Sequence, residues 1–151
     1  MRLVAAMMCV LALWGCNDTT PSTPTQLPSV TGRWTGDLSI QGVTGQMTWT
    51  LTQTGTSVTG PATIGLPNGI IFVNGTLTGT LAGTSLAYTI AVGPSGVPTQ
   101  PTCTGQFGGT MTVNTGTVST MTGPIALTST TCNIQFSSSN FTLTKQSGLG
   151  M

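Results

Sequence analysis

Apolar and polar residues alternate along almost the whole chain after residue 29, and this period of two constrains the fold more than any other feature. Trp34, Leu38 and Ile40 lie in one phase, with threonine, aspartate and serine in the other, and 47–52 repeats the pattern. Successive side chains of a β-strand point to opposite faces, so such runs bury one face and expose the other. No stretch shows the spacing of an amphipathic helix. The sequence therefore predicts an all-β fold.

Glycine- and proline-containing turn sequences divide these runs. Short turns are expected at 54–56, 67–69, 82–84 and 114–116, and the longest loop is expected at 93–101. The last strands are expected to run through Ile134 and Phe136 and then through Phe141 and Leu143. Strands at such regular spacing predict one antiparallel meander of about eight strands over residues 29–146.

Several glycines share the phase of the apolar residues, which bears on how the meander closes. Gly36 lies between Trp34 and Leu38, and Gly109 follows Phe107 in the same phase. Inward glycines help a small barrel to coil sharply, although they also occur at bulges of a sandwich. This pattern favours a closed or nearly closed barrel, with a β-sandwich as the alternative.

The N-terminus has the form of an export signal. Arg2 precedes an uncharged apolar run at 3–14, which is shorter than the roughly 20 residues that span a bilayer. The run ends in Leu-Trp-Gly and then Cys16, which resembles the lipobox of bacterial lipoproteins. The alternative is an ordinary secretory peptide. On the lipobox reading, residues 1–15 form the signal peptide.

The same resemblance implies that Cys16 becomes diacylated and anchors the protein to a membrane of the bacterial cell envelope. Asn17 follows in place of an aspartate, which by the same resemblance implies sorting to the outer membrane. Residues 16–28 are rich in proline and threonine and are expected to form an extended tether. Residues 147–151 are expected to form a flexible tail.

The first and last expected strands carry a second resemblance. Gly32, Arg33 and Trp34 open the barrel region, and Lys145 ends it. This is similar to the calycin superfamily, the lipocalin-like and avidin-like barrels, whose first strand carries Gly-x-Trp. In lipocalins a cation from the last strand lies over that tryptophan, which implies that Trp34 and Lys145 form a pair at the barrel floor. The alternative is that Trp34 only anchors the core. An outer-membrane barrel with an apolar exterior has the same alternation, but the few aromatics form no girdles.

Two cysteines, Cys103 and Cys132, remain in the expected barrel. An even pair in an oxidising envelope usually forms a disulfide. Both are expected at strand starts, so an intervening strand would separate them by about 9.6 Å, which exceeds the reach of a disulfide. The bridge then requires a loop to fold over the end of the barrel.

The charged side chains are too few for most catalytic schemes. Charged residues make up 3% of the chain, and histidine is absent. After removal of the signal peptide only Asp18, Arg33, Asp37 and Lys145 remain, and Arg33 and Asp37 are expected to form a solvated ion pair. Without histidine there is no Ser-His-Asp arrangement, and two thiols alone make a poor metal site. We therefore predict no enzyme, no metal, no cofactor and no nucleic-acid partner.

Two functions fit these features. In the first, the barrel binds a small apolar or neutral ligand, lined by Met47, Trp49, Tyr88, Phe107 and Met111. In the second, these residues only fill the core, and the protein is a structural or partner-binding surface lipoprotein whose protein partner is unknown. A third reading, binding to an ordered surface such as ice, rests on the threonine triplets alone.

Overall fold

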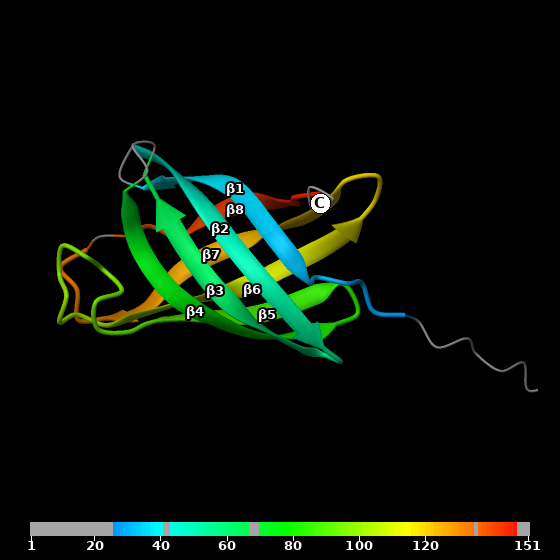
Figure 1. Cartoon of the computed structure of the whole chain (residues 1–151), viewed down its shortest axis with the longest axis horizontal. Coiled ribbons are helices and arrows are strands. Elements are labelled where there is room, and N and C mark those ends of the chain that lie inside the picture. Colours follow the sequence, from blue (N-terminus) through cyan, green and yellow to red (C-terminus); the bar gives the residue numbers. More distant parts are fainter. Residues whose placement is uncertain (1–25, 41–42, 67–69, 135, 148–151) are drawn as a thin grey trace, which may run out of the picture.

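Eight antiparallel strands form one sheet that closes on itself (Figure 1). The structure is a computed structural model that describes residues 26–40, 43–66, 70–134 and 136–147. The strands are β1 (Gly32–Ile40), β2 (Val43–Thr54), β3 (Ser57–Gly65), β4 (Ile71–Ala82), β5 (Ser85–Val92), β6 (Gly105–Thr115), β7 (Ser119–Thr130) and β8 (Ser139–Lys145). Each strand pairs with the next in sequence, and β8 pairs with β1. The predicted all-β meander is confirmed, and the sandwich alternative is wrong because the strands form a single closed sheet.

The interior of the barrel is apolar and the exterior is polar. Along β5, Leu86, Tyr88 and Ile90 are buried, whereas Ser85 and Ala87 between and beside them are exposed. The core contains only apolar, aromatic and cysteine side chains among the described residues, and no charged or polar residue is buried there as a whole. A membrane-spanning barrel has the opposite arrangement, with an apolar exterior.

Connections differ between the two ends of the barrel. At the end where residues 27–31 lead into β1, called the N-terminal end below, tight turns connect the strands. Gly55 and Gly83 occupy them with φ of 61° and 58°, which a residue with a Cβ rarely adopts. The other end, called the loop end, carries the long β5–β6 and β7–β8 connections (Figure 1). The expected turn at 67–69 lies outside the described residues.

The expected strand through Ile134 and Phe136 is wrong. Residues 131–134 and 136–138 form no strand and connect β7 to β8. The Phe136 ring instead packs edge-on against Phe107, with ring centroids 5.1 Å apart. Burial over the end of the barrel thus satisfies these apolar side chains without a ninth strand.

Inward glycines allow neighbouring strands to coil closely past one another. A Cβ on Gly36 would fall on the carbonyl oxygen of Thr142 in β8, and one on Gly109 would fall on that of Pro124 in β7. Around Gly109 the β6–β7 pairing stops after Gly108↔Ala126 and resumes at Thr112↔Thr122. The space beside these glycines is therefore filled by backbone of the next strand.

Candidate functional site

Trp34 and Lys145 lie together at the N-terminal end, on the adjacent strands β1 and β8. Their Cα atoms are paired in the ladder, and the Lys145 Nζ lies 5.5 Å from the centroid of the Trp34 ring. The Trp34 Nε1 donates to the carbonyl of Val30 at 2.8 Å, and Lys145 Nζ donates to that of Ser29 at 3.1 Å. The two side chains thus hold the segment before β1 across this end of the barrel.

That segment continues the core beyond the first strand. Val30 is fully buried, and Leu27 packs against the core. The backbone N–H of Val30 donates to Gln53 Oε1 at 2.8 Å, and the backbone N–H of Gln53 donates to Thr31 Oγ1 at 3.0 Å. Leu27, near the end of the expected tether, therefore lies against the barrel.

All five expected ligand-lining residues point into the barrel. Met47, Trp49, Tyr88, Phe107 and Met111 are each at most 4% exposed. The rings pack on one another, with Trp49 and Tyr88 centroids 4.8 Å apart. All five belong to one apolar core, in which Trp49 also packs edge-on against Phe141 and Phe107 packs edge-on against Phe136.

Tyr88 and Trp49 differ in how their polar atoms are satisfied. The Tyr88 hydroxyl donates to the carbonyl of Pro124 at 2.9 Å, and burial raises the pKa of this phenol well above its usual range. The Trp49 Nε1 is buried and has no hydrogen-bond partner, and the same is true of Ser139 Oγ. Such atoms are rare in folded proteins.

The sequence reasoning missed Ser139. It lies in the inward phase of β8, two residues before Phe141, whose ring is 5.8 Å from that of Trp49. The alternation of Phe141 and Leu143 was sufficient to place it on the inner face, had the pattern been extended by one step.

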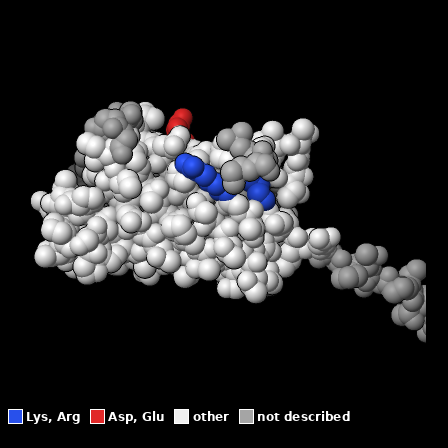
Figure 2. Space-filling view, in the orientation of Figure 1, with Lys and Arg blue, Asp and Glu red and all other residues white. Residues whose placement is uncertain are grey.

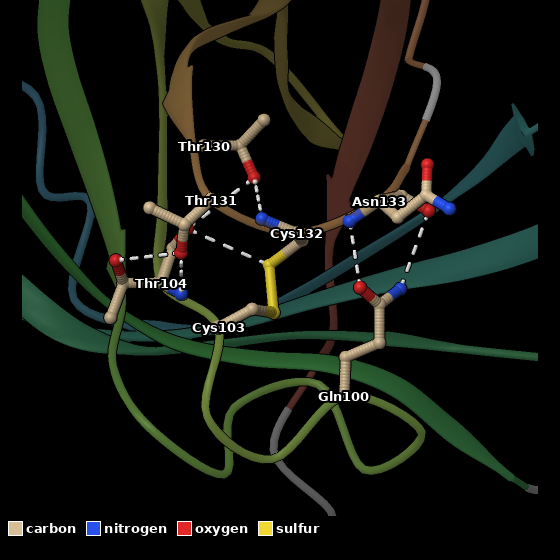
Figure 3. Close-up of a disulfide and its surroundings, with 7 residues drawn as sticks. All are labelled: Gln100, Cys103, Thr104, Thr130, Thr131, Cys132 and Asn133. Carbon is tan, nitrogen blue, oxygen red and sulfur yellow. Dashed lines mark hydrogen bonds between the residues drawn. A yellow bond between two sulfur atoms is a disulfide. The ribbon is translucent and has the colours of Figure 1, made fainter.

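The Cys103–Cys132 disulfide is confirmed, with Cα atoms 4.8 Å apart (Figure 3). The expectation of an intervening strand is wrong, because Cys132 follows the end of β7 and does not begin a strand. Gly105 of β6 pairs with Thr130 of β7, so continuing this hairpin by two residues on each side places the two cysteines opposite each other.

Hydrogen bonds fix the two long loops around the disulfide (Figure 3). The Gln100 side chain accepts from the Asn133 amide at 2.7 Å and donates to its carbonyl at 3.3 Å. The Thr131 amide donates to the Thr104 carbonyl at 2.8 Å, and the Thr104 amide donates to Thr131 Oγ1 at 2.9 Å. The loop end is therefore held by covalent and polar contacts.

The charged side chains of the described residues all lie on β1 or β8. They are Arg33 and Asp37 on β1 and Lys145 on β8. On the side of the molecule drawn in Figure 2, charged side chains cover only a small part of the surface. The expected ion pair between Arg33 and Asp37 is wrong, because the described structure contains no such contact. Four residues of strand separate their Cα atoms by about 13 Å.

The described residues contain no helix with the length and apolarity needed to cross a bilayer. They also contain no group of three histidine, cysteine or acidic side chains placed to hold a metal ion. Cys16 and the rest of the predicted signal and anchor lie outside the described residues.

Comparison of the chain with protein-family models, curated proteins and solved structures finds no match. The class of protein is therefore defined by the fold itself. It is a closed eight-stranded antiparallel barrel with meander topology. This architecture is compatible with a calycin-like fold, including the cation that lies over the first-strand tryptophan.

Proposed function

We propose that this protein is a lipid-anchored protein of the bacterial cell envelope, sorted to the outer membrane and without enzymatic activity. The proposal is supported by the apolar run ending at Cys16 and by the scarcity of ionisable side chains. Two or three acyl chains on Cys16 would anchor the chain stably, since each buried CH₂ contributes about 0.8 kcal/mol.

Intact-mass analysis of the protein purified from envelope membranes tests the anchor. We expect loss of residues 1–15 and added acyl mass on Cys16. Cys16→Ser should release the protein from the membrane. A mature chain that begins elsewhere, or that carries no acyl mass, would contradict the anchor and leave an ordinary secreted protein.

The barrel itself, we propose, has a filled core and acts through its outer surface, as a structural or partner-binding domain. The observation that carries this is the packing of Trp49 against Tyr88 and Phe141, at 4.8 and 5.8 Å, in the place where an interior ligand would lie. The backbone contacts at Gly36 and Gly109 fill further interior space.

A second candidate is the binding of a small apolar or neutral ligand inside the barrel. The unpartnered Trp49 Nε1 and Ser139 Oγ favour it, because a ligand with a hydrogen-bond acceptor would satisfy the indole. No charged side chain lies in the described core, so the ligand would be uncharged.

Native mass spectrometry of the protein purified from its envelope separates the two. A filled core predicts no mass beyond that of the covalently acylated mature chain in every preparation. A reproducible added mass that is lost on denaturation would favour the ligand instead. Trp49→Phe should then abolish the added mass, whereas Trp34→Phe, which removes an indole already bonded to Val30, should retain it.

A further inference from the structure

A hollow lies on the outer face of the barrel toward the loop end, where β5 parts from β4. The β4–β5 ladder ends at Thr76↔Ala91, and beyond it the backbone N–H of Asn74 donates to the carbonyl of Gly96 in the β5–β6 loop at 2.7 Å. The loop therefore takes the place of β5 beside β4. The space between them, called the outer hollow below, has a volume of about 320 Å³, at the lower end of the range of small-molecule sites.

The floor of the outer hollow is formed by neighbouring residues of β3, β4 and β5. Thr76 pairs with Pro61 on one side and with Ala91 on the other, and all three are exposed. The next outward row along these strands consists of threonines alone, at Thr59, Thr78 and Thr89. The floor thus differs from the adjacent surface, because it combines a proline ring and a short apolar side chain with one hydroxyl.

The wall of the outer hollow is a turn at the start of the β5–β6 loop. The Gly96 N–H donates to the Gly93 carbonyl at 3.0 Å, so Pro94 and Ser95 are the central residues of this turn. Ser95 has a φ of 66°, a value that glycine or asparagine normally supplies at this turn position. No other residue with a Cβ has a positive φ in the described ranges. Such backbone strain in a side-chain-bearing residue gathers at functional sites.

Contacts behind the wall fix its position. The Ser95 N–H donates to the Pro101 carbonyl at 2.7 Å, and Val97 is 1% exposed. Farther along the loop, Cys103 is bonded to Cys132. A site whose backbone is already fixed loses little conformational entropy when a ligand binds.

The outer hollow presents polar groups that the barrel itself does not use. The side chains of Asn74, Thr76 and Ser95 are exposed and make no hydrogen bond to another described residue. Each of these side chains can both donate and accept. The residues that line the hollow include no charged side chain. These features match an uncharged molecule that carries several hydroxyls and one apolar face.

We propose that the outer hollow binds a neutral saccharide, of the size of one or two sugar residues. The sugar hydroxyls bond to Asn74, Thr76 and Ser95, and the C–H face of the ring packs on the proline and alanine of the floor. A peptide is the poorer fit, because Thr76 is paired on both sides and the floor offers no free strand edge. The inference rests on the proposal that the barrel acts through its outer surface.

The test is an NMR titration of the acylated full chain in a detergent whose headgroup is not a sugar. The probes are maltose, cellobiose and diacetylchitobiose, with a blocked neutral peptide for comparison. We expect at least one disaccharide to shift the amide signals of 74–76 and 93–96, while the indole N–H signal of Trp49, which reports on the interior, stays in place. The proposal is overturned if no disaccharide shifts these amides, if the peptide binds more tightly, or if the Trp49 signal moves instead.

Two substitutions separate binding from folding. Thr76→Val removes the floor hydroxyl and keeps the shape of the side chain, and Ser95→Gly removes the wall hydroxyl. Each should weaken binding by about three- to tenfold, the loss of one hydrogen bond. Ser95→Gly should at the same time keep or raise the unfolding temperature, because glycine adopts a positive φ without strain.

Thr78→Val is the matched control, because Thr78 lies on the same face of β4 outside the outer hollow. It should leave the affinity unchanged, and equal weakening by Thr76→Val and Thr78→Val would contradict the site. Trp49→Phe should also leave this binding intact, whereas it should abolish binding inside the barrel. Failure of the saccharide site leaves the filled core and the anchor untouched, because native and intact mass measurements test those separately.

Discussion

The two ends of the barrel are closed by different means. At the N-terminal end a fully buried valine, an indole hydrogen bond and a lysine over the indole hold the chain against the core. At the loop end a disulfide and the amide of Gln100 hold two long connections together. The first is a packed extension of the core, and the second is a clamp between loops.

This difference indicates which end is free to vary. Packing around Trp34 tolerates little change in volume, because cores are close-packed. The clamp at Cys103 and Cys132 fixes where the loops begin and end, and most of the loop residues described between these positions are exposed, although Gly96 and Val97 are buried. If Cys16 is the anchor, the chain that leads from the membrane reaches the barrel at the N-terminal end. The loop end is then the end of the barrel opposite to that point.

The largest expected effect is at the N-terminal end. Trp34→Ala should lower the free energy of unfolding by about 3–5 kcal/mol, because it leaves a cavity and frees the Val30 carbonyl. Urea denaturation measures the loss. Trp49→Ala is the control, since it removes an equally buried indole from mid-barrel. Only Trp34→Ala should also make residues 27–31 susceptible to protease, and equal susceptibility in both variants would contradict the comparison.

The disulfide is expected to have the next largest effect. Replacing Cys103 and Cys132 with alanine should lower the free energy of global unfolding by up to about 3.6 kcal/mol on the chain-entropy estimate for a 29-residue separation. Beyond this global change, hydrogen exchange should increase most at 93–104 and 131–134, where the clamp also holds the loops. An equal increase at 27–31 would show that the clamp acts on the whole barrel and has no local effect at the loop end.

Lys145 should contribute less than either. Lys145→Met keeps the apolar stem but removes the hydrogen bond to Ser29 and the charge over Trp34, so a loss of about 1 kcal/mol is expected. Arg33→Met is the matched control on the neighbouring strand, and its exposed side chain should change stability by less than about 0.5 kcal/mol. Equal effects of the two variants in thermal unfolding would argue against the cation over the ring.

The ionisation of Tyr88 should have the smallest effect on stability at neutral pH. Because Tyr88 lies away from both ends of the barrel, it serves as a reference for the two ends. Burial raises its pKa, so the folded chain keeps the phenolic proton at pH values where the unfolded chain has lost it. Stability should therefore fall as the pH rises above about 10 and be unaffected below that range. The chain has one tyrosine, so phenolate absorbance reports this group alone.

Phenolate should appear only together with global unfolding, and Tyr88→Phe should remove this part of the high-pH instability. Phenolate that appears before unfolding would mean that one end of the barrel opens in the folded state. Repeating the titration with the disulfide reduced would then identify the loop end as the one that opens.

Much of the barrel could be predicted from local patterns. Alternation placed Trp34, Met47 and Trp49 on the inner face, and short glycine turns marked 54–56 and 82–84. These features depend on residues close in sequence, and for this reason the sequence predicts them. The prediction of a strand through Ile134 and Phe136 was wrong because two alternating apolar residues occur both in a paired strand and in a loop that packs over the end of a barrel.

Contacts between distant residues were less accessible. The predicted separation of Cys103 and Cys132 was wrong because it depended on that extra strand. One wrongly assigned strand changes which strands are expected to be neighbours from that point of the chain onward. The inward position of Ser139 follows from the alternation of Phe141 and Leu143, but its lack of a hydrogen-bond partner depends on residues distant in sequence. The short ladder between β1 and β8 depends on how Gly36 meets Thr142, more than a hundred residues away.

The sequence by itself determined that the chain forms strands, which face of each strand is apolar and where most turns fall, since side-chain direction repeats every two residues. The tertiary structure decided that the sheet closes on itself, that aliphatic and aromatic side chains pack together in its interior, and that the β1–β8 ladder contains two pairs at the N-terminal end. Closure and packing depend on the summed coiling of eight strands, and no local stretch of sequence contains that sum.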